Sequence, residues 1–388
     1  MPAKILVVDD EPDLEQLILQ KFRKQIREEL FSFKFANNGV QALERLAEDD
    51  TIDLVLTDIN MPEMDGLTLL TRIKEQEKPA LRSVIVSAYG DIENIRTAMN
   101  RGAFDFVIKP IDLNDLEITI NKSLNDLRVL KEAMQSRDQL MFIKHELGIA
   151  TEIQTSILPK TFPPFPERKE FDIFAKMIPA REVGGDLYDF FLIDKSRVGI
   201  IIGDVSGKGI PAAMFMAVSK TLLKATALKG IPSDSCLESV NTVLVDESLP
   251  SMFVTVFYGI FDTRNGSLEY CNGGHNPPYL ISKEGQVRQL ENRGGVFLGA
   301  LKNLEYESNV VMLQPGETLF LITDGISEAM NTEEAMFGET RTREALQAHA
   351  AAPLDGLVDG VIRDVQAFAG AQEQSDDMTC LALRYFGK

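Results

Sequence analysis

The stretch KILVVDD, residues 4–10, decides how the first part of the chain folds. Its aliphatic run is short, lacks polar alternation and ends in two adjacent carboxylates, as expected for a strand buried on both faces of a parallel sheet. Further aliphatic runs occur at residues 54–56, 84–86 and 106–108, and amphipathic helical stretches separate them. This alternation predicts a doubly wound α/β domain in the first 110 residues, with its site at the carboxyl ends of the strands.

Length and composition limit the classes of protein to consider. The 388 residues suffice for two or three domains, and a hydrophobic content of 44% can give each a core. Forty Lys and Arg against 59 Asp and Glu give a net charge of -19, which disfavours nucleic acid and anionic membranes as partners. Three widely spaced cysteines exclude a disulfide scaffold or a cysteine-rich zinc site. Because no apolar run suits a membrane span or a signal peptide, we expect a cytoplasmic protein.

Residues 111–147 contain neither Pro nor Gly, and Pro159 follows. This stretch predicts one long helix, or two abutting helices, and we assign residues 112–158 to a helical linker between two domains. Its apolar residues step by three or four from Leu116 to Ile157, with one skip near Ser136, which predicts a coiled-coil seam that joins two copies in a homodimer. The alternative is a single helix packed on its own domain. A length of roughly 70 Å favours the linker.

The sequence pattern changes after three closely spaced prolines at positions 163, 164 and 166. Residues 159–388 show strand-like alternation with many glycine turns, and the predicted strands outnumber the helices, which indicates an α+β layered domain. The predicted strands cover residues 171–178, 187–193, 198–202, 253–261, 267–271, 318–323 and 378–385, and the predicted helices cover residues 212–228, 236–247 and 354–368.

Five polar residues follow the predicted strands of the first domain. Asp9 and Asp10 follow the aliphatic run of residues 5–8, Asp58 follows that of residues 54–56, Ser87 follows that of residues 84–86 and Lys109 follows that of residues 106–108. Parallel strands bring their carboxyl ends to one edge, so these side chains should converge there. Three crowded carboxylates repel one another unless a divalent cation compensates, and Mg²⁺ prefers oxygen ligands. With such an ion, one carboxylate can attack a phosphoryl group while a lysine and a hydroxyl bind its oxygens, which predicts an aspartyl phosphate.

The motifs DD (9–10), DINMP (58–62), DG (65–66), SA (87–88) and KP (109–110) together resemble the receiver domain of two-component response regulators. The resemblance covers about residues 1–125 and implies a flavodoxin-like α/β fold, Mg²⁺ and a cognate sensor histidine kinase as partner. It implies that Asp58 is the phosphoacceptor and that Ser87 and Lys109 bind the phosphoryl group. Phe106 stands where the family places a switching aromatic residue. The implied Mg²⁺ ligands are Asp9 through water, Asp10, Asp58 and the carbonyl of Asn60.

A second set of acidic residues lies beside glycines or at predicted strand edges of the C-terminal domain. Its members are Asp186, Asp204, Asp324 and the pair Asp376 and Asp377. Small neighbours let metal ions and a phosphate approach the backbone, and no basic residue stands directly beside these aspartates. Carboxylates without His or Cys select Mg²⁺ or Mn²⁺ over zinc. Two such ions that share an aspartate would activate a water molecule for attack on a phosphate ester.

The segments PAREVGGDLYD (179–189), GDVSGKGIPAA (203–213), GHNPP (274–278), TDG (323–325) and DDMT (376–379) resemble the SpoIIE/RsbU branch of PPM (PP2C-type) serine/threonine phosphatases. The resemblance implies a β-sandwich with flanking helices and two Mn²⁺ or Mg²⁺ ions. Asp204 would bridge both ions with help from the Val205 carbonyl. Asp324 and Asp376 would bind one ion, with Asp377 as the alternative to Asp376. Further positions are Asp186 near the other ion and Arg181 at the substrate phosphate. The turn-rich surroundings of His275 favour a structural role over catalysis.

Together, the two resemblances imply a response regulator in which phosphorylation of Asp58 controls a metal-dependent protein serine/threonine phosphatase. The implied substrate is a phosphorylated STAS-type anti-sigma factor antagonist in a partner-switching pathway, and the direction of control stays open. The alternative is a non-catalytic adaptor that binds a sigma factor or an antagonist. Retention of four metal-binding carboxylates favours the enzyme. A DNA-binding regulator is disfavoured by charge and by the lack of a basic recognition helix after Asp112.

Overall fold

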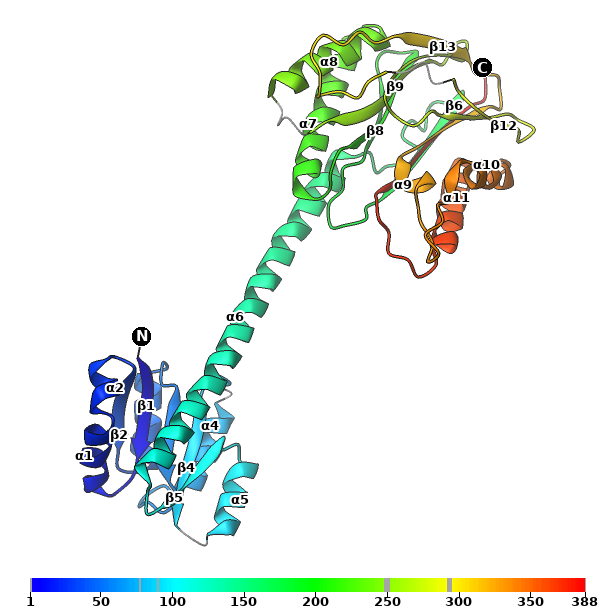
Figure 1. Cartoon of the computed structure of the whole chain (residues 1–388). Coiled ribbons are helices and arrows are strands. Elements are labelled where there is room, and N and C mark those ends of the chain that lie inside the picture. The colour runs from blue at the N-terminus through cyan, green and yellow to red at the C-terminus, as the bar shows by residue number, and fades with distance from the viewer. Residues whose placement is uncertain (1, 77, 89–90, 248–251, 292–294, 388) are drawn as a thin grey trace. The chain divides into compact units, whose positions relative to one another are not determined.

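The computed structural model describes residues 2–76, 78–88, 91–247, 252–291 and 295–387. Contacts within the chain define two compact units, a first unit of residues 1–143 and a second unit of residues 144–388. The boundary falls inside α6 (Leu113–Ile157), one uninterrupted helix of 45 residues (Figure 1). The predicted linker is therefore one helix rather than two abutting ones, and it continues through Ser136 without a break.

The first unit is a five-stranded parallel sheet in the order β2-β1-β3-β4-β5. Its strands are β1 (Ala3–Val8), β2 (Phe31–Ala36), β3 (Leu54–Asp58), β4 (Arg82–Ala88) and β5 (Asp105–Lys109). Its own helices are α1 (Pro12–Lys21), α2 (Arg23–Arg27), α3 (Gly39–Glu48), α4 (Gly66–Glu75) and α5 (Ile92–Asn100). This architecture confirms the predicted doubly wound α/β fold. The strand order reverses between β1 and β3, so the carboxyl ends of these two strands are the place expected for a site.

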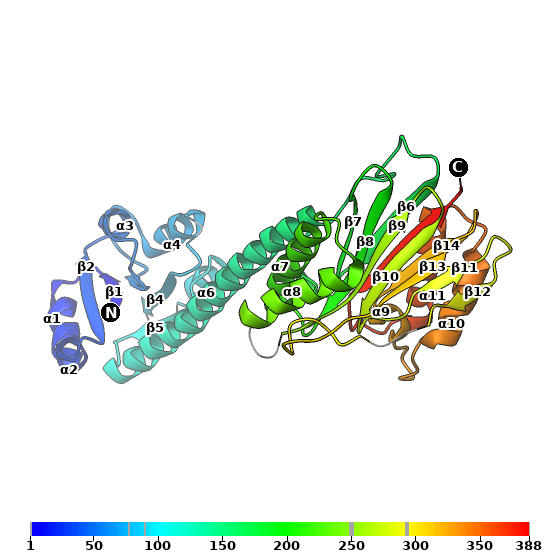
Figure 2. The same cartoon turned by 90° about the horizontal axis from the view of Figure 1, so that it is seen from above.

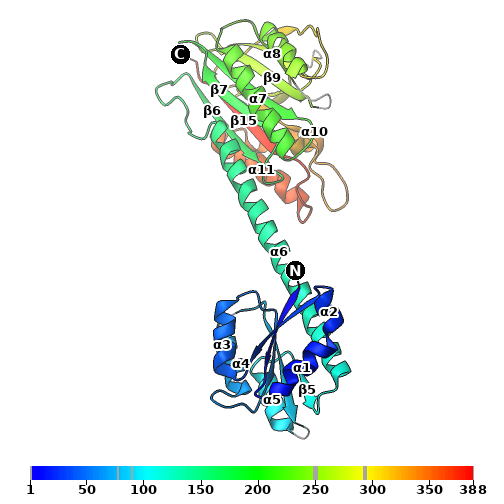
Figure 3. The ribbon, with the colours of Figure 1, turned by 90° about the vertical axis from the view of Figure 1, so that its left-hand side faces the viewer.

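Both faces of this sheet are covered by helices, and this explains the continuous aliphatic run of β1. Ile5 and Val7 belong to a core shared with α1 and the start of α6, whereas Leu6 and Val8 belong to a core shared with α3 and α4. Figure 3 shows α3 and α4 on one side of the strands and α1 with α6 on the other. Successive residues of a strand point to opposite faces, so a strand between two helical layers needs apolar residues at every position.

The structure divides the predicted seam of α6 into two parts. Leu116, Ile120 and Leu127 are buried in the first unit, as the alternative of a helix packed on its own domain required. Residues 132–146 are all exposed. The apolar residues in this stretch are 39–65% exposed and comprise Met134, Leu140, Met141, Phe142 and Ile143. Only the second part of the seam is therefore available for pairing with another helix. Among the described residues, no helix combines the length and the apolar character needed to cross a membrane.

The second unit contains two five-stranded sheets, ordered β13-β10-β9-β8-β7 and β12-β11-β14-β15-β6, whose neighbouring strands are antiparallel. The strands are β6 (Phe171–Ile178), β7 (Leu187–Leu192), β8 (Arg197–Val205), β9 (Val254–Asp262), β10 (Ser267–Gly273), β11 (Tyr279–Ile281), β12 (Val287–Gln289), β13 (Ser308–Met312), β14 (Thr318–Ile322) and β15 (Met378–Tyr385). The helices are α7 (Ile210–Ala227), α8 (Ser233–Glu247), α9 (Asp324–Ser327), α10 (Gly338–His349) and α11 (Leu354–Ala369).

These elements form four layers. Ile200 and Ile202 of β8 and Leu381 of β15 belong to the core between the two sheets. Ile201 points the other way, into a core shared with α7 and α8, and Cys380 lies in a core shared with α9, α10 and α11. Figure 2 shows α7 and α8 on one side of the strands and α10 and α11 on the other. The layered α+β domain with a β-sandwich is thus confirmed, although β11, β12, β13, α9 and α10 were not predicted.

Close packing at Gly66 gives a test of the first unit. A Cβ atom at Gly66 would lie 2.1 Å from the carbonyl oxygen of Asp58 and 3.1 Å from the Cα of Ile59. Because both neighbours are backbone atoms, we expect Gly66→Ala to lower the free energy of unfolding of this unit by about 1–3 kcal/mol. Differential scanning calorimetry of the full chain measures the change.

The control is Gly148→Ala in the interior of α6, where a Cβ atom would have no neighbour within 4 Å. There the greater helix propensity of alanine should raise stability by up to about 1 kcal/mol. An unchanged transition in the Gly66→Ala variant would contradict the close approach of α4 to the end of β3.

Candidate functional site

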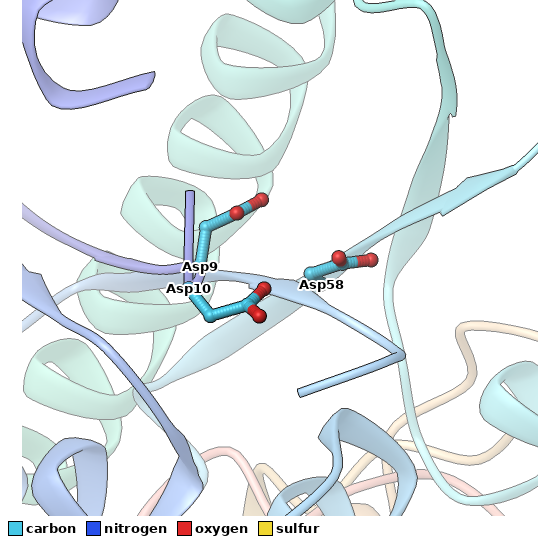
Figure 4. Close-up of side chains that lie close together, drawn as sticks. All are labelled: Asp9, Asp10 and Asp58. Atoms are coloured by element: carbon cyan, nitrogen blue, oxygen red, sulfur yellow. The ribbon is translucent and has the colours of Figure 1, made fainter. Parts of the chain in front are cut away.

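Three carboxylates meet at the predicted edge of the first sheet. Asp9 follows β1, Asp58 ends β3, and ligand oxygens of Asp9, Asp10 and Asp58 all lie within 4.8 Å of one another. Figure 4 shows the three side chains gathered beside the strand ends. Asp9 and Asp58 are buried whereas Asp10 is exposed, so the group is open to solvent on one side. In the described part of the chain, no other group of three or more His, Cys, Asp or Glu residues has its ligand atoms within 4.8 Å of one another. These oxygen ligands fit Mg²⁺.

Lys109 supplies the positive charge of this pocket. Its Nζ lies 2.9 Å from Oδ2 of Asp58, 3.1 Å from Oδ2 of Asp9 and 3.1 Å from Oε1 of Glu11. Burial alone would lower the pKa of Lys109, but the hydrogen bonds to Asp58, Asp9 and Glu11 outweigh it and the pKa is raised. Burial raises the pKa of Asp9, and this effect outweighs the hydrogen bonds from the Glu11 amide and Lys109, which lower it. Glu11, the third acid beside Lys109, was not among the residues predicted from sequence.

Ser87 lies where a phosphoryl-binding hydroxyl is needed. It is 1% exposed on β4, next to Val86, the residue that pairs with Asp58. Its Oγ is buried and has no hydrogen-bond partner among the residues that the structure describes. A buried hydroxyl without a partner is unusual in a native protein and is available to an incoming oxygen. Asn60 is exposed two residues after Asp58, and Phe106 of β5 is 36% exposed; their roles as carbonyl ligand and switch stay predictions.

The second group of carboxylates is drawn from both sheets of the second unit. Asp186 precedes β7 and Asp204 lies in β8, whereas Asp324 opens α9 after β14 and Asp376 lies shortly before β15. Burial and repulsion from Asp324 and Asp376 raise the pKa of Asp204 to about 7. Burial and repulsion, chiefly from Asp376, raise the pKa of Asp324 to about 6. Burial and the charges of Asp204 and Asp377 also raise the pKa of Asp186. The structure therefore brings the four predicted carboxylates into one region.

This region has more negative charge than its neighbours neutralise. Oδ1 of Asp324 is buried and has no hydrogen-bond partner within the described part of the chain. In the described residues, the ion pair that reaches the group is that of Lys208 with Asp376, 2.8 Å long. Oxygen ligands with uncompensated charge and no His or Cys fit divalent cations such as Mg²⁺ or Mn²⁺. Among the described residues, these four carboxylates do not form a cluster as compact as that of Asp9, Asp10 and Asp58 in the first unit.

Two threonines fix the buried carboxylate of Asp186, which is 1% exposed. Its Oδ2 accepts hydrogen bonds from the hydroxyl of Thr323, at 2.7 Å, and from that of Thr379. Thr323 lies between β14 and α9, and Thr379 lies in β15, so both threonines come from the opposite sheet. Both threonines belong to the motifs TDG (323–325) and DDMT (376–379), but no role was predicted for them. Their adjacency to Asp324 and to the Asp376–Asp377 pair was the available indication.

The structure separates the roles of the adjacent Asp376 and Asp377. Oδ1 of Asp377 accepts a hydrogen bond from the amide of Ala180 at 2.8 Å, and its Oδ2 accepts from the amides of Gly185 at 2.7 Å and Asp186 at 3.4 Å. Backbone groups therefore occupy both carboxylate oxygens of Asp377. Oδ2 of Asp376 instead pairs with the ammonium group of Lys208. This geometry favours Asp376 as the ion ligand and Asp377 as a support for the backbone.

The remaining predicted residues lie around this group. A Cβ atom on Gly185 would lie 2.9 Å from the carbonyl oxygen of Val205, so the glycine turn closely approaches that proposed ligand. Arg181 is exposed, and no ion pair within the described ranges joins it to the carboxylates. His275 is buried, burial lowers its pKa to about 4, and its Nδ1 lies 3.0 Å from the hydroxyl of Thr255. This uncharged, packed ring agrees with the structural role that its turn-rich sequence favoured.

Comparison with known proteins finds relatives of both units. The family model for the response regulator receiver domain matches residues 5–121. The family model for Stage II sporulation protein E (SpoIIE) matches residues 194–386. Phosphoserine phosphatase RsbU of Bacillus subtilis is 30% identical over 243 residues, which cover 62% of this chain and 70% of RsbU.

Protein IcfG of Synechocystis sp. is 30% identical over 265 residues, but they cover 61% of this chain and only 41% of IcfG. Among solved structures, the SiaA-PP2C domain of Pseudomonas aeruginosa has a TM-score of 0.56 at 23% identity, over 64% of this chain and 98% of that domain. At this identity the last likeness concerns the fold alone.

The different surroundings of Asp376 and Asp377 give a matched pair of variants. We expect Asp376→Asn to weaken Mn²⁺ binding more than about tenfold, because it removes a ligand charge. The free energy of unfolding of the ion-free protein should change by less than about 1 kcal/mol, because only a part-exposed ion pair is lost. Asp377→Asn should instead lower that free energy by about 2 kcal/mol, because it weakens hydrogen bonds from backbone amides to a charged acceptor.

Isothermal titration calorimetry with Mn²⁺ and urea unfolding of the ion-free chain measure the two effects. Equal loss of Mn²⁺ affinity with equal stability in both variants would contradict the division of roles.

Proposed function

Because the chain belongs to the SpoIIE family of PPM (PP2C-type) phosphatases and carries a response regulator receiver domain, we propose that it is a response regulator whose output is metal-dependent dephosphorylation of a protein on serine or threonine. The observation that carries this proposal is the convergence of Asp186, Asp204, Asp324 and Asp376, together with a buried oxygen of Asp324 that no described residue contacts by a hydrogen bond. The name of RsbU, a phosphoserine phosphatase, supports the same class of substrate.

In the proposed chemistry, the residues of the candidate site in the second unit have separate tasks. Two Mg²⁺ or Mn²⁺ ions held by the carboxylates would neutralise the phosphate ester and activate a water molecule for its hydrolysis. Asp204 interacts with the charges of Asp186, Asp324 and Asp376, which supports its role as the residue shared by both ions. Its neighbour Val205 would contribute a carbonyl oxygen. The exposed Arg181 is the proposed contact for the substrate phosphate.

The first unit would receive the signal. An oxygen of Asp58 attacks the phosphorus of a phosphorylated histidine on a sensor kinase, the phosphorus–nitrogen bond breaks, and the electron pair leaves with the imidazole. Ser87 and Lys109 would bind the transferred oxygens. Mg²⁺ would be held by Asp58 and by the other predicted ligands, which are Asp9, Asp10 and the carbonyl of Asn60. The side chain of Phe106 would change position on phosphorylation.

The proposed substrate is a STAS-type anti-sigma factor antagonist phosphorylated on serine, as the resemblance to the SpoIIE/RsbU branch implies. Phosphorylation of Asp58 would act on hydrolysis through α6, which belongs to both units. The added phosphoryl group brings roughly two negative charges to a small pocket, enough to bias two arrangements of a helix. The adaptor alternative is disfavoured because the carboxylates of a cation site are present and brought together.

Hydrolysis is tested with a serine-phosphorylated STAS protein and Mn²⁺, in the presence and absence of beryllofluoride as a mimic of the Asp58 phosphoryl group. We expect Asp204→Asn to lower the rate at least about a hundredfold, because it removes the charge shared by both ions. Beryllofluoride should change the rate of the wild type but not that of Asp58→Asn. Equal rates of hydrolysis in the wild type and Asp204→Asn would overturn the catalytic assignment.

We further propose that the exposed part of α6 pairs two chains into a homodimer. The apolar exposure of Leu140 and Ile143, 60% and 53%, is the supporting observation. Leu140→Asp combined with Ile143→Asp should convert the dimer to a monomer, because two charges would enter the pairing surface. Analytical ultracentrifugation measures the mass, and Gln139→Asp is the control. A monomeric wild type at tens of micromolar would refute the dimer.

A further inference from the structure

The amide side chain of Gln154 connects α6 to the backbone beside Asp186. Gln154 is 5% exposed. Its Nε2 donates to the carbonyl oxygen of Gly184, and its Oε1 accepts from the amide of Gly184 at 3.0 Å. One turn earlier, the hydroxyl of Thr151 donates to the carbonyl oxygen of Glu182. A single side chain therefore satisfies both backbone groups of Gly184, which is the pairing that a neighbouring strand would otherwise provide.

Residues 182–186, here named the Gly184 loop, are held from a second side by Asp377. Its Oδ2 accepts from the amides of Gly185 and Asp186. A Cβ atom at Gly184 would lie only 2.1 Å from that same oxygen. The backbone of the loop thus lies between the amide of Gln154 and the carboxylate of Asp377. Because Gly184 and Gly185 have no side chains to pack, hydrogen bonds must fix this backbone.

We propose that Gln154 is a positioning residue for the ion site: it fixes Gly184 to the last turns of α6 and so holds Asp186 where it contributes to cation binding. The inference rests on the proposed function, since it gives the end of α6 a part in the phosphatase site. The hydrogen bonds between Gln154 and Gly184 are the contact through which a shift of α6 would alter the ion site. The contact lies wholly within the second unit.

Other contacts hold the end of α6 in place without Gln154. Leu158, just after the helix, lies in the core between the sheets. The hydroxyl of Tyr188 donates to the carbonyl oxygen of Pro159 at 2.8 Å. Removal of the Gln154 amide should therefore leave the helix end docked and free only the Gly184 loop. This separation distinguishes positioning of the ion site from simple anchoring of the helix.

The test compares Gln154→Leu, which keeps the size of the side chain but makes no hydrogen bonds, with Gln154→Glu, which keeps an acceptor for the Gly184 amide. Glu152→Leu makes the same kind of change at a neighbouring exposed position and is the control. All variants are made in the full chain. Hydrogen exchange of the Gly184 loop is followed in ion-free protein, Mn²⁺ affinity by calorimetry, and kcat and KM with p-nitrophenyl phosphate at several Mn²⁺ concentrations.

For Gln154→Leu we expect exchange of the Gly184 loop to be at least about tenfold faster, because a buried pair of hydrogen bonds is lost. Mn²⁺ affinity should fall about tenfold to a hundredfold, with most of kcat restored at saturating Mn²⁺. Gln154→Glu should fall between Gln154→Leu and the wild type, and Glu152→Leu should equal the wild type.

Loss of thermal stability with unchanged exchange of the Gly184 loop and unchanged Mn²⁺ affinity would overturn the inference and leave Gln154 as a helix anchor. If Gln154→Leu fails to fold, Gln154→Glu decides: wild-type exchange and affinity in that folded variant would overturn the inference. A wild type that binds Mn²⁺ but hydrolyses no phosphate ester would overturn the proposed function. The ion-binding readouts would still decide the role of Gln154.

Discussion

Carboxylates held close together repel one another, and each unit of this chain contains such a group. In the first unit the repulsion among Asp9, Asp10 and Asp58 is partly offset by the ammonium group of Lys109. In the second unit, burial and the repulsion from neighbouring carboxylates raise the pKa of Asp204. The surrounding structure must hold these groups in place against their repulsion. Helices on both faces of the sheet in the first unit, and hydroxyl and amide donors in the second, provide that support.

The parts of the fold that follow from sequence are those with a clear local pattern. β1 has a continuous aliphatic run from Ile5 to Val8 because both its faces are covered, and the first six residues of β6 alternate between buried and half-buried, so a strand could be predicted in each. β15 is buried at all but one of its eight positions, and its run of apolar residues marked it as a strand. β11 and β12 have three residues each, too few to show a period. α10 buries only a few of its twelve residues, so its apolar stripe is too narrow to recognise.

In the candidate sites too, the residues marked by a local sequence pattern could be predicted and the others could not. Asp9, Asp58, Asp186 and Asp204 stand at strand ends or beside glycines and were identified from those positions. The residues that support them were missed, because their partners are far away in sequence. Gln154 contacts a residue 30 positions later, and Thr379 contacts one 193 positions earlier. Hydrogen bonds of this kind depend on how the sheets assemble, and no local pattern reports them.

The ion pair between Lys208 and Asp376 means that the acidic group in the second unit already holds a tethered monovalent cation. Binding of a divalent ion at Asp376, as proposed above, would therefore be an exchange, in which the attraction between the ion and Asp376 replaces the attraction between Lys208 and Asp376. Lys208 stands between Gly207 and Gly209, which both have positive φ and open space where a Cβ atom would lie, so neighbouring side chains do not pack against these two glycines. The departing ammonium group would then be free to meet an anion arriving from solvent.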